Sequence, residues 1–210
     1  MRQPTRRSRK IGLTQGGRVR DGHPSEKPSR VFTRDLWDRL STRLGDGPPV
    51  VLKENPSGAY LHPCQGLEYM AVLERLPPGL HRELKAVVLR RTPKLDDRLG
   101  VEARKRFLCV ILNAFPKSML MVWNAGVGPA TRRHYGRWCS GEWITRGDEV
   151  TLHWGIEELG RYYLYHLFLH EIGHINQPLF HSTRRREEYA ENFALEWADR
   201  LGELPPKRDA

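Results

Sequence analysis

The sequence predicts an α+β protein in which a small twisted sheet packs on a long helix in the C-terminal half. Two observations predict this fold class. Four short apolar, β-prone runs lie between residues 86 and 154, and two strongly periodic helical segments follow them up to residue 201. With 210 residues, the chain is long enough for one domain with a sizeable hydrophobic core.

Residues 1–30 are expected to form a disordered basic arm, and residues 31–210 a single folded domain. The arm has nine Lys or Arg residues and two acidic ones, so it carries +7 of the chain's net charge of +10. It has few large apolar residues and therefore buries too little surface to offset its ordering entropy. Such an arm either binds nucleic acid through counterion release or simply keeps the protein soluble, and its lack of aromatic residues favours the second role.

The folded domain is expected to open with an amphipathic helix over residues 31–44, where apolar residues recur at every fourth position. Next, the short apolar runs 50–52 and 59–61 flank an Asn-Pro-Ser-Gly sequence at 55–58, a pattern typical of a β-hairpin. A second helix is expected over residues 66–76, because a Pro-Pro-Gly sequence follows it.

Four strands are expected next, and together they would form the sheet. They cover residues 86–89, 107–112, 119–123 and 148–154. In the fourth strand, apolar and polar residues alternate, as they do in a half-buried strand. The stretch 124–146 between the third and fourth strands has four glycines and many charged residues, and this composition predicts a surface loop.

The first of two closing helices is expected over residues 157–175. An apolar stripe runs along it at three- and four-residue steps and leads into His170 and His174. The stripe consists of Ile156, Leu159, Tyr163 and Leu167. A helix places residues four apart on one face, so the two imidazoles can share a metal ion. Glu171 lies beside them, and zinc hydrolysis needs such a carboxylate to take a proton from the activated water.

The second closing helix, over residues 184–201, is expected to supply the third metal ligand. Its inward-facing stripe comprises Ala190, Ala194, Trp197 and Leu201. Glu187 stands at the head of this stripe and is the best-placed ligand, whereas Glu188 and Glu191 point to a more polar side and remain alternatives. His181 comes one residue too late for the three-histidine pattern of metzincins, and stays a candidate donor to an oxyanion.

Two motifs in the last quarter of the chain together resemble the gluzincin branch of zinc metallopeptidases, which includes compact proteases of the ImmA/IrrE type. They are H-E-x-G-H at residues 170–174 and E-x-x-A-x-x-F-A at residues 187–194. The resemblance implies that Glu171 is the general base and that Zn²⁺ is bound by His170, His174 and Glu187. The sequence departs from the family at Glu191, where Asp or Asn is usual; Glu191 is a candidate to orient the ring of a ligand histidine.

These features predict a zinc metalloendopeptidase that hydrolyses peptide bonds in a protein or peptide substrate. The resemblance also implies that a strand near the helix with His170 and His174 borders the substrate cleft. Residues 150–154 are the candidate for that strand, and a plain interior strand is the alternative for them. The alternative function is a zinc-stabilised binding or regulatory domain, associated with nucleic acid through the basic arm and without hydrolysis. Glu171 favours the enzyme, because a structural zinc site has no use for a free carboxylate beside the metal.

The cysteines and the apolar runs predict the cellular setting. Cys64, Cys109 and Cys139 form no C-x-x-C pair, which disfavours both a disulfide scaffold and a separate thiolate zinc site. The apolar runs are all shorter than the ~20 residues that span a bilayer. We therefore expect a soluble, cytoplasmic protein that does not bind membranes.

Overall fold

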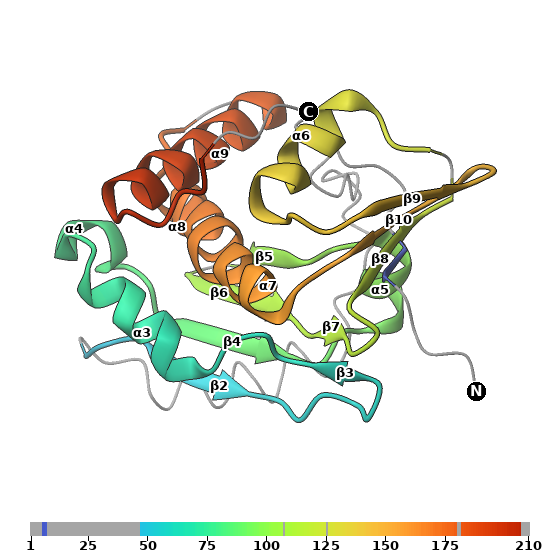
Figure 1. Ribbon diagram of the computed structural model, residues 1–210. Coiled ribbons are helices and arrows are strands. Elements are labelled where there is room, and N and C mark those ends of the chain that lie inside the picture. Colours follow the sequence, from blue (N-terminus) through green and yellow to red (C-terminus); the bar gives the residue numbers. More distant parts are fainter. Residues whose placement is uncertain (1–5, 8–46, 107, 125, 180–181, 207–210) are drawn as a thin grey trace.

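The computed structural model describes residues 6–7, 47–106, 108–124, 126–179 and 182–206. Within these residues, helices and short strands form mixed layers, and the predicted α+β class is confirmed (Figure 1). The predicted helix 31–44 and the predicted arm lie outside the described residues, except for the two-residue strand β1 (Arg6–Arg7). No helix in the described part of the chain combines the length and apolarity that a membrane span requires.

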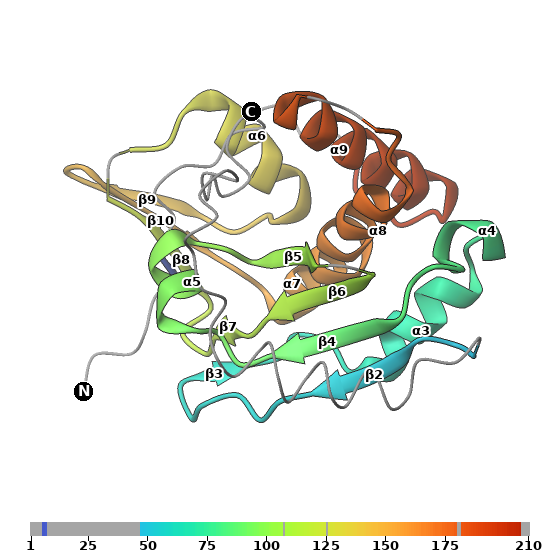
Figure 2. The same ribbon diagram turned by 180° about the vertical axis from the view of Figure 1, so that it is seen from behind.

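The first of two four-stranded sheets lies under the helix that carries the H-E-x-G-H motif. In order across the sheet, its strands are β2 (Val50–Lys53), β4 (Ala86–Arg90), β6 (Cys109–Asn113) and β5 (Ala103–Arg106). The first three strands run parallel, and β5 pairs antiparallel with β6. Every residue of β4 and β6 is buried, which explains their continuous apolar sequences. Figure 2 shows this sheet from behind, with helix α3 (Gly66–Glu74) beside β4.

The second sheet is a smaller, mainly antiparallel layer. Its strands, in order, are β1, β8 (Leu120–Trp123), β10 (Glu149–His153) and β9 (Trp143–Arg146). β10 and β9 are joined by a tight turn in which Gly147 has a φ of 59°, a conformation that favours glycine. β1 pairs parallel with β8. Two further strands, β3 (Tyr60–Leu61) and β7 (Phe115–Pro116), pair only with each other among the described strands.

Two predictions about strand pairing are wrong. The runs 50–52 and 59–61 do not form a hairpin, because β2 pairs with β4 and β3 pairs with β7. The four predicted strands also do not share one sheet: β4 and β6 belong to the first sheet, and β8 and β10 to the second. A local apolar pattern identifies a strand but not its partner, which depends on packing between segments far apart in the chain.

The prediction of a surface loop over residues 124–146 is also wrong, because this stretch contains β9 and the helix α6 (Pro129–Trp138). The buried residues of α6 are Thr131, Tyr135 and Trp138, which lie four and three residues apart on one face. A proline occupies the first helical position, where its missing N–H is harmless. Arginine and glycine residues between the buried positions obscure this helical pattern in the sequence.

The predicted helix 157–175 is one continuous helical segment with a π-helical turn at its centre. It comprises α7 (Ile156–Tyr162), the π turn η1 (Tyr163–Leu167) and α8 (Phe168–Asn176). Most of the predicted apolar stripe is buried, but Ile156 at the start is 54 % exposed and does not belong to it. A π turn inside an α-helix often marks a functional site, and no sequence pattern predicted this one.

The remaining helices complete the core around α8. α4 (Pro78–His81) follows α3, and α5 (Lys94–Leu99) connects β4 to β5. The predicted second closing helix is confirmed as α9 (Thr183–Arg200), which packs along α8 (Figure 1).

Gly173 on α8 is what lets α8 and α9 approach closely. A methyl group at position 173 would lie 3.0 Å from Ala190 Cα and 3.1 Å from Phe193 Cβ. Ala190 and Ala194 are completely buried, so small residues line the contact on both helices.

Gly173→Ala should therefore push the two helices apart and lower stability, since overpacking a tight contact costs ~1–3 kcal/mol. The expected result is a lower midpoint of thermal unfolding, followed by circular dichroism. Gly136→Ala is the matched control, because a methyl group on this α6 glycine would meet no atom within 4 Å. If both variants unfold at the wild-type temperature, the α8–α9 contact is looser than the structure shows.

Candidate metal centre

The three predicted metal ligands converge where α8 packs against α9. His170 Nε2 lies 3.5 Å from Glu187 Oε2, and His174 Nε2 lies 3.6 Å from Glu187 Oε1. One ligand atom from each residue lies within 4.8 Å of those of the other two. We call these three residues the first His/Glu cluster.

The donor set of the first cluster fits Zn²⁺. Two imidazole nitrogens and one carboxylate are a known ligand set of catalytic zinc sites. Ligand atoms at ~2.0–2.1 Å from a tetrahedral ion are about 3.3–3.4 Å apart, which is close to the 3.5 and 3.6 Å observed between the imidazoles and the carboxylate. The two distances run to different oxygens of Glu187, so each carboxylate oxygen faces one of the two imidazoles.

The Nδ1 atoms of His170 and His174, which are the outer ring nitrogens that do not face Glu187, also have surroundings that suit metal binding. His174 Nδ1 donates a hydrogen bond to Gln177 Oε1 at 3.0 Å. In the neutral ring this leaves the Nε2 lone pair of His174 directed at Glu187. His170 Nδ1 faces Glu191 Oε2 at 3.6 Å, slightly beyond a direct hydrogen bond. Metal-binding histidines usually have such an acceptor at the nitrogen that does not bind the metal.

The electrostatics of the first cluster favour a positive charge among these groups. Burial lowers the pKa of His170, but the carboxylates Glu187 and Glu191 outweigh this effect and raise that pKa to about 10. Burial raises the pKa of Glu187, but His170 and His174 outweigh it and lower that pKa to about 2. Both shifts have the same cause, which is the attraction between a buried carboxylate and the charge that it faces.

Glu171, the predicted general base, is buried beside the first cluster with an exposed fraction of 7 %. Burial raises the pKa of its carboxyl group, and the charges of His174 and His170 oppose this shift. A backbone hydrogen bond from Lys105 on β5 also holds the carboxylate. Glu171 therefore lies next to both the first cluster and β5, and its raised pKa makes it a better proton acceptor.

The alternative ligands do not join the first cluster. Glu188 forms an ion pair with Arg184 at 2.6 Å, and 44 % of its side chain is exposed. Glu191 instead faces the outer nitrogen of His170, at the place expected for a residue that orients a ligand histidine. His181 lies outside the described residues.

The strand predicted to border the cleft is not the strand beside α8. β10 lies inside the second sheet, where β8 and β9 flank it on both sides. β5 and its neighbour β6 are the strands that contact α8, and among the described strands β5 pairs with β6 alone. The sequence Ala-Arg-Lys-Arg has no apolar pattern, so no strand was predicted at residues 103–106.

Two histidines that the sequence did not single out lie next to the first cluster. His134, His166 and Glu191 also bring one ligand atom each within 4.8 Å of one another, and we call them the second His/Glu cluster. One sequence feature does point to His166: it precedes His170 by four residues, so that three histidines follow one helix face. His134 had no such indication, because it lies in the helix that was predicted to be a loop.

Cys64, Cys109 and Cys139 are free and buried. Cys109 lies inside β6. The Cys139 thiol donates a hydrogen bond to the carbonyl oxygen of His153 at 3.3 Å. Burial raises the pKa of Cys64 to about 12 and that of Cys109 to about 11, so both are thiols and not thiolate ligands at neutral pH.

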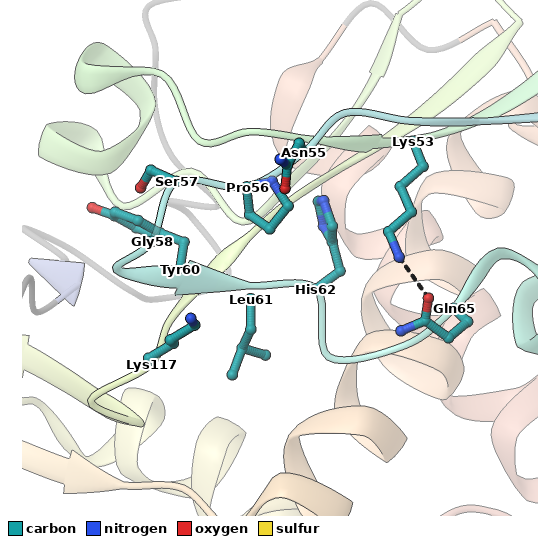
Figure 3. Close-up of a pocket in the computed structure, with 10 residues that line it drawn as sticks. All are labelled: Lys53, Asn55, Pro56, Ser57, Gly58, Tyr60, Leu61, His62, Gln65 and Lys117. Carbon is teal, nitrogen blue, oxygen red and sulfur yellow. Dashed lines mark hydrogen bonds between the residues drawn. The ribbon is translucent and has the colours of Figure 1, made fainter.

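A polar cavity of about 540 Å³ lies around β2 and β3 and contains no residue of α8 or α9. Figure 3 shows Lys53 and Lys117 at its two sides and the hydrogen bond from Lys53 Nζ to Gln65 Oε1, which is 2.7 Å long. His62, also in its wall, is bonded through Nε2 to the carbonyl oxygen of Glu54 at 2.9 Å. This cavity is therefore separate from the two His/Glu clusters.

Comparisons of the chain with protein-family models, with curated proteins and with solved structures give no match. The resemblance to gluzincins thus rests on the two motifs at residues 170–174 and 187–194, and the support for a function comes from the geometry of the site.

Proposed function

We propose that this protein is a zinc-dependent endopeptidase in which the first His/Glu cluster holds the metal ion. The observation that carries the proposal is the convergence of two imidazole Nε2 atoms on Glu187, with Glu171 buried beside them. This combination provides three metal ligands of the right type and a separate carboxylate that remains available for proton transfer.

The residues of the site have distinct tasks in peptide hydrolysis. Zn²⁺, when bound, supplies the Lewis acidity that polarises a substrate carbonyl and makes a water molecule easier to deprotonate. Glu171 accepts the proton of the attacking water and then gives a proton to the leaving amine. Gln177 accepts a hydrogen bond from the outer ring nitrogen of His174 and so orients that imidazole, while Glu191 faces the outer nitrogen of His170 at 3.6 Å.

β5 suits a protein or peptide substrate in extended conformation. It is an edge strand among the described strands, and it contacts α8 near Glu171. An extended chain can add to such an edge through main-chain hydrogen bonds. The scissile peptide bond would then lie close to the first cluster and to the general base.

The binding-domain alternative finds less support. Its distinguishing feature is the basic arm, of which the structure describes only Arg6 and Arg7. A zinc ion that served only to stabilise the fold would have no use for Glu171, and burying an additional carboxylate there would be unfavourable.

Glu187→Ala should lower the zinc content of the purified protein by about one ion per chain, because a His₂ pair alone binds zinc weakly. Elemental analysis of metal per folded chain measures this loss. Glu188→Ala is the matched control: it removes the neighbouring carboxylate, which pairs with Arg184 at the surface, and should keep the wild-type content. Equal zinc content in both variants would contradict the assigned ligand set.

A further inference from the structure

The second His/Glu cluster joins three helices that are far apart in the sequence. His134 comes from α6, His166 from the π turn η1, and Glu191 from α9. His166 Nε2 lies 3.0 Å from Glu191 Oε2, and His134 Nδ1 lies 3.6 Å from Glu191 Oε1. The rings of His134 and His166 have centroids 4.7 Å apart. Glu191 Oε1 thus faces His134, and Oε2 faces His166 and also His170 of the first cluster.

The imidazole of His166 is held firmly in this position. Only 3 % of the residue is exposed. Its ring stacks on Tyr162 with a centroid distance of 5.1 Å and an angle of 9° between planes, and Trp138 lies 5.5 Å away on another side. Because η1 is a π turn, it changes the angular position of His166 relative to an uninterrupted α-helix. The result is a preorganised nitrogen directed at Glu191.

The charge balance around Glu191 calls for a cation. In the residues that the structure describes, every ion-pair partner of Glu191 and of Glu187 is a histidine, and none is Lys or Arg. Glu171 adds a third carboxyl group nearby. Buried carboxylates are unfavourable unless a positive charge or a metal ion compensates them. The partners that face Glu191 are the imidazoles of His134, His166 and His170.

We propose that the second His/Glu cluster is a binding site for a second divalent transition-metal ion of the zinc type. Two imidazole nitrogens and a carboxylate suit Zn²⁺, and such nitrogen ligands exclude a preference for Mg²⁺ or Ca²⁺. This site goes beyond the proposed peptidase function, and two of its three ligands, His134 and His166, have no task in that function.

The second ion acts on the first site through Glu191 and not on the substrate. The ring of His170 separates the two sites, with Nε2 in the first cluster and Nδ1 facing Glu191 Oε2. Two-metal catalysis needs ions about 3.5–4 Å apart that clamp one substrate, and an intervening imidazole prevents this. The second ion instead fixes α6, η1 and α9 relative to one another and holds the carboxylate that orients His170.

This site is tested by measuring zinc binding to the full chain. The measurements are equilibrium dialysis against buffered free Zn²⁺ and elemental analysis. Wild type should take up about two ions per chain, and His134→Ala and His174→Ala about one each. His153→Ala is the control, because this exposed histidine belongs to neither cluster and should leave uptake at about two. Circular dichroism verifies that each variant is folded, and His134→Asn repeats the test with a polar side chain in place.

The outcomes separate the two proposals. In one outcome, wild type takes up about one ion, His174→Ala abolishes this uptake and His134→Ala preserves it. This outcome overturns the second site and leaves the peptidase proposal standing. The reverse pattern, with loss only in His134→Ala, supports the second site and overturns the first. No uptake by folded wild type overturns both.

Discussion

Glu171→Gln should lower peptide hydrolysis by about 10²–10⁴-fold, the usual contribution of a general base. Gln has nearly the same shape as Glu but cannot accept a proton from the attacking water. Its side chain is still able to occupy the buried position beside β5, where the carboxylate is only 7 % exposed. The zinc content should stay at the wild-type level, because Glu171 does not belong to the first cluster.

Turnover of an unstructured protein substrate and zinc content per chain are the two measurements for this variant. Glu157→Gln provides the control, since it makes the same chemical change at an exposed position on α7. A Glu171→Gln protein that is zinc-loaded and fully active would refute the assigned base. If it loses zinc together with activity, Glu171 is a metal ligand and its proposed role is wrong.

The convergence of His170, His174 and Glu187 was predictable because the positions of all three depend on local helix geometry. His170 and His174 share a face through their four-residue spacing, and Glu187 stands at the head of a stripe that contains Ala190 and Ala194. Gly173 and the two alanines indicate a close helix–helix contact, which the structure confirms. Once α8 and α9 pack along these small residues, the three side chains have to meet.

The surroundings of the site were less predictable for two reasons. They depend on pairing between strands far apart in the chain, and the charged composition of β5 and α6 hides the periodic apolar pattern of a strand or helix. The charged sequence of β5 did not look like a strand, although antiparallel pairing with β6 places it beside α8. α6 has only three buried residues among arginines and glycine, so His134 could not be placed near His166. The π turn depends on the packing of η1, for which no sequence rule is available.

β5 depends on a buried polar group for its position. Asp96, at 4 % exposure, lies in α5 and accepts hydrogen bonds from Arg104 on β5 and from Asn113 on β6. Its second oxygen also lies 3.7 Å from Arg90 on β4. One carboxylate thus ties three neighbouring strands of the first sheet together, and β5 in turn bonds Glu171 through the backbone of Lys105.

Asp96→Ala should lower the free energy of unfolding by about 3–5 kcal/mol, because removing one partner of a buried ion pair leaves the other charge uncompensated. Arg90 is 8 % exposed and the Arg104 side chain 30 %, so water only partly replaces the lost carboxylate. Urea denaturation measures the change, and Asp148→Ala at an exposed turn is the control, expected within about 0.5 kcal/mol of wild type. Asp96→Asn keeps the shape and removes the charge, so a milder loss of stability in this variant assigns the effect to electrostatics.

If Asp96→Ala were as stable as the control, Asp96 would not be the residue that holds β5 against α8. If Asp96→Ala is destabilised as expected, its folded fraction should still bind zinc through the residues proposed on α8 and α9. Hydrolysis should fall, because β5 would no longer hold Glu171 and the substrate in position.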